Sequence, residues 1–190
     1  MKLALCGGLW ILSPVLFLLH GQEPVSVTHL ELDGLKTLRH EVVVEAKLQD
    51  LWDLFTTSDG VTSWIAPVAK IDFREGGLGE TSYDPNAAFG APENIVFRYH
   101  NIIPLKSYDS ELVRPPKDNP FGKVLMELKN RLIFEDLGEG KVKVSILMMG
   151  WQDGAEHQSV MEFFEQGNTW YCQQLIKRCK EGPQPFPKTN

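Results

Sequence analysis

The sequence predicts an α+β fold in which a curved antiparallel sheet wraps around one long C-terminal helix. Three observations lead to this prediction. Segments rich in β-branched and aromatic residues, separated by turn residues, fill the middle of the chain. Two short helical segments follow the first of these strands, and a long apolar stripe at helical spacing comes near the end of the chain. The order of elements therefore favours a sheet packed against a helix.

The first strand is expected over residues 39–46, where RHEVVVEA is rich in β-branched side chains. The preceding VTHLEL alternates polar and apolar residues and is compatible with a strand or an ordered lead-in. After the strand, apolar residues follow helical spacing at Leu48, Leu51, Trp52 and Phe55. Asp59-Gly60 is expected to end this helix, and VTSWIAP is expected to form a second short helical turn that ends at Pro67.

Two pairs of strands are expected next. KIDFRE and LGETSYDP flank Gly76-Gly77, which predicts a hairpin. NIVFRYHNII and KSYDSELV continue the sheet on either side of Pro104. The first of these two strands carries on one face Ile95, Phe97 and Tyr99. RPPKDNPFGK, residues 114–123, consists of turn residues and predicts a loop.

MELKNRLIFEDL and KVKVSILMMGW flank Gly138-Glu139-Gly140 and predict another hairpin. One face of its second strand carries Val142, Val144, Ile146 and Met148. The other face carries Lys141, Lys143 and Ser145, so we expect one buried and one solvated face.

The last predicted element is a helix over about residues 157–180, long enough to cross a sheet. Its apolar stripe comprises Val160, Phe163, Phe164, Tyr171, Leu175 and Cys179. Residues 181–190 contain one Gly and three Pro and predict a disordered tail.

The composition indicates a mildly acidic single domain. The chain has 190 residues, enough for one hydrophobic core but not comfortably for two. Lys and Arg total 19 against 25 Asp and Glu, and no basic stripe is present, which argues against nucleic-acid binding through charge. Cys172 and Cys179 are separated by about 10.5 Å along a helix axis, too far for a disulfide bond. No His or Cys motif has metal-ligand spacing, so neither a metal nor a cofactor is expected.

The N-terminus differs from the rest of the chain in composition. No charged residue occurs from Leu3 to Leu19, and Lys2 precedes this run. Because the run contains Gly and Pro and is at the short limit for crossing a bilayer, residues 1–21 are expected to be a signal peptide. An uncleaved anchor is the alternative. Cleavage predicts a periplasmic or secreted protein without stable membrane insertion, in which residues 22–37 form an N-terminal lead-in.

Several strings of the sequence occur in an order that resembles one family. EVVVEAKLQDLWDLFTT is followed by WIAP, KIDFREGGLGE and NIVFRYHNIIPLKSY, and then by LIFEDLGEGKVKVSI and GNTWYCQQLIKRC. Over residues 38–180, this ordered set resembles the SRPBCC superfamily, also called START-like or birch-pollen-allergen-like. Within it, the set is similar to the family named after the activator of the heat-shock-protein-90 ATPase homologue. Two departures are the residues between Gly167 and Trp170 and the length of the loop at 114–123.

The resemblance implies a helix-grip fold whose sheet and long helix enclose a cavity, which in many relatives holds a small hydrophobic molecule. Because the fold implies no universal activity, the chemistry stays open. We expect an exported carrier or sensor of a small hydrophobic ligand, in a superfamily that includes lipid-binding and polyketide-cyclase-like members. One alternative is a cavity enzyme of cyclase, dehydratase or hydrolase type that uses acid–base catalysis. Another is a protein-interaction module related to the heat-shock-protein-90 ATPase activator, although a signal peptide conflicts with a cytosolic co-chaperone role.

Parity selects most of the residues expected to line the cavity: Phe73, Tyr83, Phe97, Tyr99, Ile146, Met148, Phe164 and Tyr171. Trp64, in the WIAP step before Pro67, is added as a candidate gate. Each of them also suits an ordinary hydrophobic core, and a Trp beside two short helices is a common core residue. Four carboxylates surround the early hairpin and suit either acid–base chemistry or a solvated surface: Glu75, Glu80, Asp84 and Glu93. No catalytic residue is assigned, and an enzyme is the less favoured class. The oligomeric state is left open.

Overall fold

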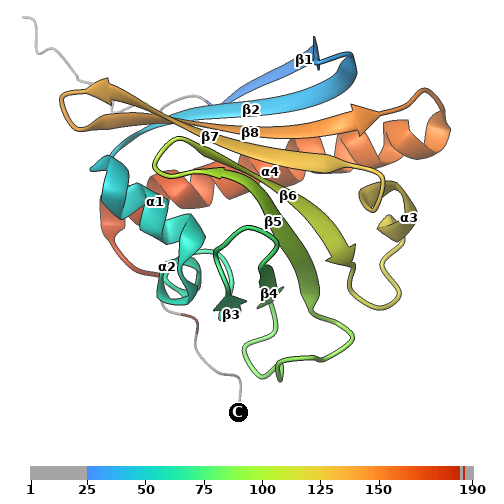
Figure 1. The fold of residues 1–190 in the computed structure, drawn as a ribbon, viewed down its shortest axis with the longest axis horizontal. Coiled ribbons are helices and arrows are strands. Elements are labelled where there is room, and N and C mark those ends of the chain that lie inside the picture. The colour runs from blue at the N-terminus through green and yellow to red at the C-terminus, as the bar shows by residue number, and fades with distance from the viewer. Residues whose placement is uncertain (1–24, 185, 187–190) are drawn as a thin grey trace, which may run out of the picture.

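A long helix, α4 (Ala155–Glu181), crosses one face of an antiparallel sheet in the computed structural model, which describes residues 25–184 and 186 (Figure 1). The strands of the sheet are β1 (Ser26–Leu32), β2 (Leu35–Glu45), β3 (Val68–Ile71), β4 (Leu78–Ser82), β5 (Ile95–Ile103), β6 (Ser107–Arg114), β7 (Lys129–Gly138) and β8 (Lys141–Trp151). The short helices are α1 (Leu48–Thr56), α2 (Ser58–Thr62) and α3 (Gly122–Leu125). The predicted fold class, an α+β helix-grip arrangement with two short helices after an early strand, is confirmed.

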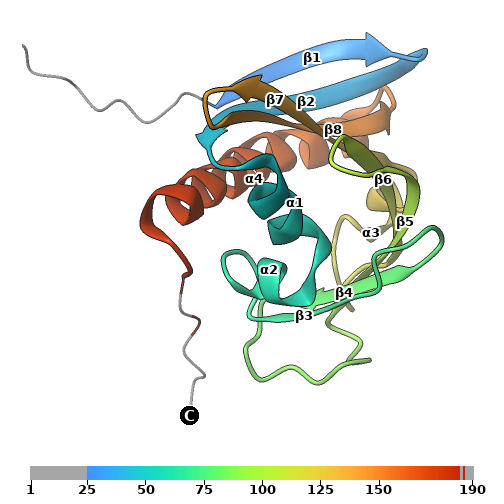
Figure 2. The same ribbon diagram turned by 60° about the vertical axis from the view of Figure 1, so that its left-hand side comes forward.

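The strands follow one another across the sheet in the order β1-β2-β8-β7-β6-β5-β4-β3. Figure 2 shows the sheet curving from β1 and β2 above α4 to β3 and β4 below α1 and α2. The curvature leaves α1, α2 and α4 inside the bend, so the concave face of the sheet and these helices share one interior.

Alternation along the strands decides which side chains face this interior. Val142, Val144, Ile146 and Met148 of β8 are buried, as predicted. The predicted solvated face is confirmed only at the start of β8, where Lys141 is exposed and Lys143 is half-buried; further along, Ser145, Leu147 and Met149 are buried as well. Leu147 is paired with Arg39 of β2 on one side and Arg131 of β7 on the other. The two arginines flank Leu147 on the neighbouring strands, and their aliphatic stems help to shield it from water.

Several element boundaries differ from the prediction. The lead-in is strand β1, and β2 begins four residues before the predicted strand, at Leu35. Asp59 and Gly60 do not end a helix but lie inside α2; the break between α1 and α2 is at Thr57, which has extended backbone angles. The Thr57 hydroxyl accepts a hydrogen bond from the Gly60 N–H at 2.9 Å, an N-cap that residue spacing alone did not indicate.

Aromatic side chains form the part of the core between α1 and the sheet. The Trp52 ring on α1 makes edge contacts with Phe73, Tyr108 and Phe134, at centroid distances of 5.6, 5.9 and 5.1 Å. This cluster fills one end of the interior, which places any open space further along the sheet, toward α3 and the middle of α4.

The sequence predicted a signal peptide at the N-terminus and a disordered tail at the C-terminus. Residues 1–21 lie outside the described residues, so the signal peptide stays a prediction. Of the predicted tail, Glu181 is the last residue of α4, and the backbone N–H of Gln184 donates a hydrogen bond to the Ser63 carbonyl at 2.7 Å. Among residues 25–184 and 186, no helix combines the length and the apolar character that crossing a membrane requires.

Buried His40 on β2 gives a first testable prediction. Its Nε2 lies 3.0 Å from the Glu165 carbonyl oxygen, while its Nδ1 is buried without a partner, and burial lowers the pKa below 6.5. The unfolded chain therefore takes up a proton at a higher pH than the folded chain does. We expect the free energy of unfolding to decrease as the pH falls from about 6.5 toward the folded-state pKa.

Urea unfolding of wild-type protein and His40→Gln at a series of pH values checks this expectation. The amide of Gln can still donate to the Glu165 carbonyl, whereas it cannot titrate. The two curves of stability against pH should run parallel above pH 7.5 or so and diverge below about 6.5. Parallel curves over the whole range would show that His40 does not couple protonation to folding.

Candidate functional site

A cavity of two adjoining lobes lies between the concave face of the sheet and α4. The inner lobe has a volume of about 270 Å³ and reaches Phe55 of α1 and Tyr108 of β6. The outer lobe has a volume of about 540 Å³ and extends along α4 to Phe163 and Trp170. The residues that line both lobes, and so mark their junction, are Tyr83, Ile95, Leu112, Asn130, Ile146, Asn168 and Tyr171.

The walls of the cavity follow from strand periodicity. Every second residue of a strand points to the same face, so β5 contributes Ile95, Phe97 and Tyr99, all of which line the inner lobe. Gly79 of the neighbouring β4 has no side chain because the Phe97 ring occupies that space: a Cβ on Gly79 would lie 2.3 Å from the ring. A glycine therefore allows an aromatic wall to lie flat against the sheet.

Three aromatic side chains at the outer lobe are exposed to solvent. Tyr83 is 60% exposed, Phe163 is 52% exposed and Trp170 is 47% exposed. All three line the outer lobe, Tyr83 from the end of β4 and the other two from α4. These three residues form the mouth of the cavity. Large apolar side chains exposed together in this way are typical of the opening of a binding site.

The described lining of both lobes is electrically neutral. It contains no Asp, Glu, Lys, Arg or His. The lining does contain titratable tyrosine hydroxyls. Burial raises the pKa of Tyr99, Tyr108 and Tyr171. These phenols therefore stay protonated at neutral pH and act as uncharged hydrogen-bonding groups.

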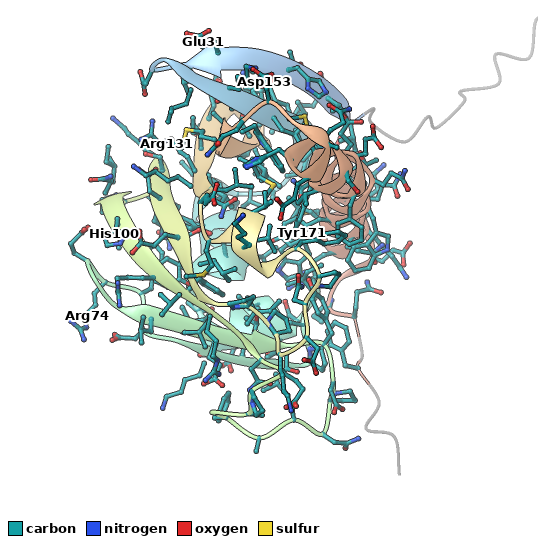
Figure 3. The ribbon with its side chains drawn as sticks, turned by 90° about the vertical axis from the view of Figure 1, so that its right-hand side faces the viewer. Glu31, Arg74, His100, Arg131, Asp153 and Tyr171 are labelled. Atoms are coloured by element: carbon teal, nitrogen blue, oxygen red, sulfur yellow. The ribbon has the colours of Figure 1, made fainter. Side chains whose placement is uncertain are left out.

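Most of the residues predicted from the sequence to line a cavity do so. Phe97 and Tyr99 line the inner lobe, and Met148 and Phe164 line the outer lobe. The residues at the junction include Tyr83, Ile146 and Tyr171. Figure 3 shows Tyr171 on the inner side of the sheet beside α4, whereas His100 and Arg131 lie on its outer side. That these residues bind a ligand stays a prediction.

Trp64 and Phe73 do not line either lobe. Trp64 is buried behind the inner lobe, where its ring contacts Phe55 and Tyr171 at 5.3 and 4.8 Å and its Nε1 donates to the Leu54 carbonyl at 3.1 Å. Phe73 follows β3 in a loop and packs against Tyr99 at 4.8 Å. Both side chains therefore support lining residues from behind instead of facing the open space.

Other lining residues were not predicted. Leu112 and Ser110 lie on β6, on the same face as Tyr108, and Asn130 lies on β7, on the same face as Leu132. Strand parity would have placed them inward, but two of them are polar and were not part of an apolar pattern. Asn168 lies in the segment where the sequence departs from its family resemblance, and its helical position gave no apolar signal.

The four carboxylates of the early hairpin are not part of the described lining. Glu80 instead fixes the loop that follows β4, because its Oε1 accepts hydrogen bonds from Asn94 Nδ2 at 2.7 Å and from the Gly90 N–H at 2.5 Å. Burial pushes the Glu80 pKa upward, but these hydrogen bonds and the charges of Arg114 and Lys70 outweigh it, so the pKa is lowered. The described residues also contain no group of His, Cys, Asp or Glu that could hold a metal ion.

A second depression, of about 880 Å³, lies beside the turn between β5 and β6. Its charged residues include Arg131, whose Nε lies 2.6 Å from Asp109 Oδ1. In this ion pair the charges of Arg131 and Asp109 compensate each other. None of the predicted site residues lies in the depression. The two-lobed cavity is therefore the stronger candidate.

Comparison with known proteins identifies relatives of this fold. The family model described as "Activator of Hsp90 ATPase homolog 1-like protein" matches residues 45–179. That match runs from the last residue of β2 into the last turn of α4 and includes every residue that lines the two lobes. No curated protein matches the chain.

Three similar solved structures illustrate the fold. The Aha1 dimer from Colwellia psychrerythraea is 16% identical, with a TM-score of 0.56 over 77% of this chain and 97% of that chain. CalU16 from Micromonospora echinospora is 13% identical, with a TM-score of 0.57 over 88% and 80% of the two chains. DynU16, a protein from the dynemicin biosynthetic locus, is 12% identical, with a TM-score of 0.58 over 80% and 50%. At these identities the likeness shows the fold alone.

Proposed function

The chain belongs to the Activator of Hsp90 ATPase homolog 1-like family of the SRPBCC superfamily, and from this premise we propose that it binds a small hydrophobic molecule in its two-lobed cavity, as a carrier or sensor. The observation that carries the proposal is the cavity itself. Its lobes, of about 270 and 540 Å³, have a mostly apolar lining and a mouth of exposed aromatic residues. Sites for small molecules are concave, mostly apolar and furnished with a few polar groups that orient the ligand.

The relatives give the proposal a second support. DynU16 is a protein of the dynemicin biosynthetic locus, and it shares this fold. A cavity of this size in a relative of such a protein fits a role with a small organic molecule.

The lining favours binding over catalysis. A cyclase, dehydratase or hydrolase that works by acid–base chemistry needs a group that exchanges a proton near neutral pH. The described lining offers neither a carboxylate nor an imidazole, and the pKa values of its buried tyrosines are raised. An interaction module, the other alternative, would need no open cavity, so the space beside α4 also argues for a ligand.

We propose in addition that residues 1–21 direct export, so that the mature protein works in the periplasm or outside the cell. The uncharged run from Leu3 to Leu19 after Lys2 supports this proposal. Expression of the full chain in its own host, followed by fractionation and N-terminal sequencing, tests it. A protein found in the cytosol that still begins with residues 1–21 would contradict export.

Native mass spectrometry of the protein purified gently from its own source tests the binding function. We expect a mass increment of one small molecule per chain, which denaturing extraction releases into organic solvent. The same protein with the ligand removed should gain thermal stability when the extract is added back, because a ligand that binds only the folded state stabilises it. An empty protein that no lipid or aromatic compound stabilises would refute the proposal.

A further inference from the structure

Three neutral polar side chains meet at the junction of the two lobes. Asn130 of β7 and Asn168 of α4 line both lobes, and Ser110 of β6 lines the inner lobe beside them. We call Ser110, Asn130 and Asn168 the polar junction. Its surroundings are mostly apolar on both sides: the inner lobe continues to Phe97 and the outer lobe to Phe164.

Strand pairing brings the polar junction together. Ser110 and Asn130 are direct partners across β6 and β7, and Asn130 is the direct partner of Met148 across β7 and β8. Asn168 reaches the same place from α4, because its Nδ2 lies 3.2 Å from the Met148 sulfur. Four secondary-structure elements thus converge on one point of the cavity.

The polar junction has unused hydrogen-bonding capacity. Among the described residues, no protein group bonds the side chain of Ser110 or Asn130, and the Asn168 amide oxygen has no protein partner. The thioether that Asn168 contacts is a weak acceptor. None of these unpaired polar atoms is fully enclosed by protein, and all three residues belong to the lining of the cavity. Water can satisfy them in an empty cavity, and a ligand that displaces this water must offer hydrogen bonds in return.

The neutrality of the lining restricts the charge of the ligand. A carboxylate, phosphate or ammonium group placed in either lobe would lose its hydration and meet no opposite charge among the described lining residues. Such burial is strongly unfavourable, whereas an uncharged oxygen needs only a hydrogen bond. The amides of Asn130 and Asn168 both donate and accept, so they suit a carbonyl or a hydroxyl group equally.

We infer that the ligand is an uncharged molecule with two apolar parts, one in each lobe, joined near a carbonyl or hydroxyl oxygen that hydrogen-bonds at the polar junction. This inference rests on the proposed function and specifies its ligand class. The inference excludes a ligand that places a carboxylate, phosphate or ammonium group inside the cavity, because such a ligand would bury a charge.

Three small probes separate the elements of the inference. Benzophenone has two rings joined by a carbonyl, diphenylmethane is the same molecule without the oxygen, and 2-benzoylbenzoate is benzophenone with a carboxylate. Dissociation constants from titration calorimetry should show benzophenone binding about tenfold more tightly than diphenylmethane, the ratio expected of one neutral hydrogen bond. The carboxylate should bind more weakly than either.

Variants of the polar junction then test whether it causes the preference for benzophenone over diphenylmethane. Asn130→Leu and Asn168→Leu, each close to the native side chain in size, should bring the ratio of the benzophenone and diphenylmethane constants close to one. Gln173→Leu is the control, because Gln173 is exposed on α4 and lines neither lobe, so the ratio should stay at its wild-type value. Thermal unfolding of each variant shows whether it is folded. Irradiated benzophenone, which inserts into C–H bonds beside its carbonyl, should label Met148 or Ile146 in wild-type protein.

The outcomes distinguish the inference from the function on which it rests. Equal binding of benzophenone and diphenylmethane, or equal binding of the carboxylate, would overturn the inference and leave a hydrophobic site in place. A preference that persists in both Leu variants would place the recognised oxygen elsewhere and would also overturn it. Failure of all three probes to bind would also overturn the inference, whereas the proposed function would be refuted only by an empty protein that no lipid or aromatic compound stabilises.

Discussion

Replacing Leu112 by Trp is expected to weaken binding of a cavity ligand about 100-fold. Leu112 is half-buried on β6 and lines both lobes, so an indole at this position projects into their junction. A ligand that spans the lobes would then meet a filled space, and the 1–3 kcal/mol or so that overpacking costs would oppose its binding. Without ligand, the indole occupies empty volume, so we expect unchanged or slightly higher thermal stability.

Calorimetric titration with the ligand extracted from wild-type protein measures this effect, and thermal unfolding shows that the variant is folded. The control is Ile103→Trp, which adds an indole to β5 at a 53% exposed position that lines neither lobe. Wild-type affinity in the Leu112 variant would mean that the ligand binds somewhere other than this cavity. A large loss in the Ile103 variant would point to the depression beside the β5–β6 turn, which Ile103 does line.

The residues predicted on regular strands, Phe97, Tyr99, Ile146 and Met148, do line the two lobes. Once NIVFRYHNII and KVKVSILMMGW are recognised as strands, a period of two assigns Phe97 and Ile146 to one face without further information. The burial of Leu147 on the opposite face could not be predicted in this way. It depends on the arginines of β2 and β7, and β2 lies beside β8 only through a pairing of residues about a hundred positions apart.

The polar residues at the junction show a different limit of sequence reasoning. Asn130 has the same strand parity as Leu132 and Phe134, both of which are buried. A search for apolar alternation passes over Asn130 because an amide on an inward face looks like an interruption of the pattern. Such a residue is informative once the open space is known, because a polar group facing a cavity needs a partner that the protein does not supply.

Trp64 and Phe73 were predicted as cavity walls and are not. Neither lies on a regular strand: Trp64 is in the turn after α2 and Phe73 is in the loop after β3. Without a period, the direction of a side chain follows from tertiary contacts, in this case with Tyr171 for Trp64 and with Tyr99 for Phe73. The sequence could identify them as apolar and buried but could not decide between wall and support.

Replacing Trp64 by Ala is expected to reduce the free energy of unfolding by about 3–5 kcal/mol. The Trp64 side chain is buried against Phe55 and Tyr171, so truncation leaves a void that close-packed neighbours refill only in part. The change also leaves the Leu54 carbonyl without the indole N–H that it accepts at 3.1 Å. Urea unfolding followed by circular dichroism measures the loss, and Trp64→Phe should lose less because the ring fills part of the space.

Trp170 provides the matched comparison, because it is the same residue type at the mouth of the cavity and 47% of it is exposed. Trp170→Ala should change stability by no more than about 0.5 kcal/mol, as exposed substitutions usually do, while weakening the binding of a ligand. The two tryptophans therefore distinguish a residue that supports the cavity wall from one that contacts the ligand. The Trp64 variant should lose stability, and the Trp170 variant should lose affinity. If Trp64→Ala instead kept its stability and lost affinity, Trp64 would be a wall of the site, as first predicted from the sequence. The packing of Trp64 behind the inner lobe would then be wrong.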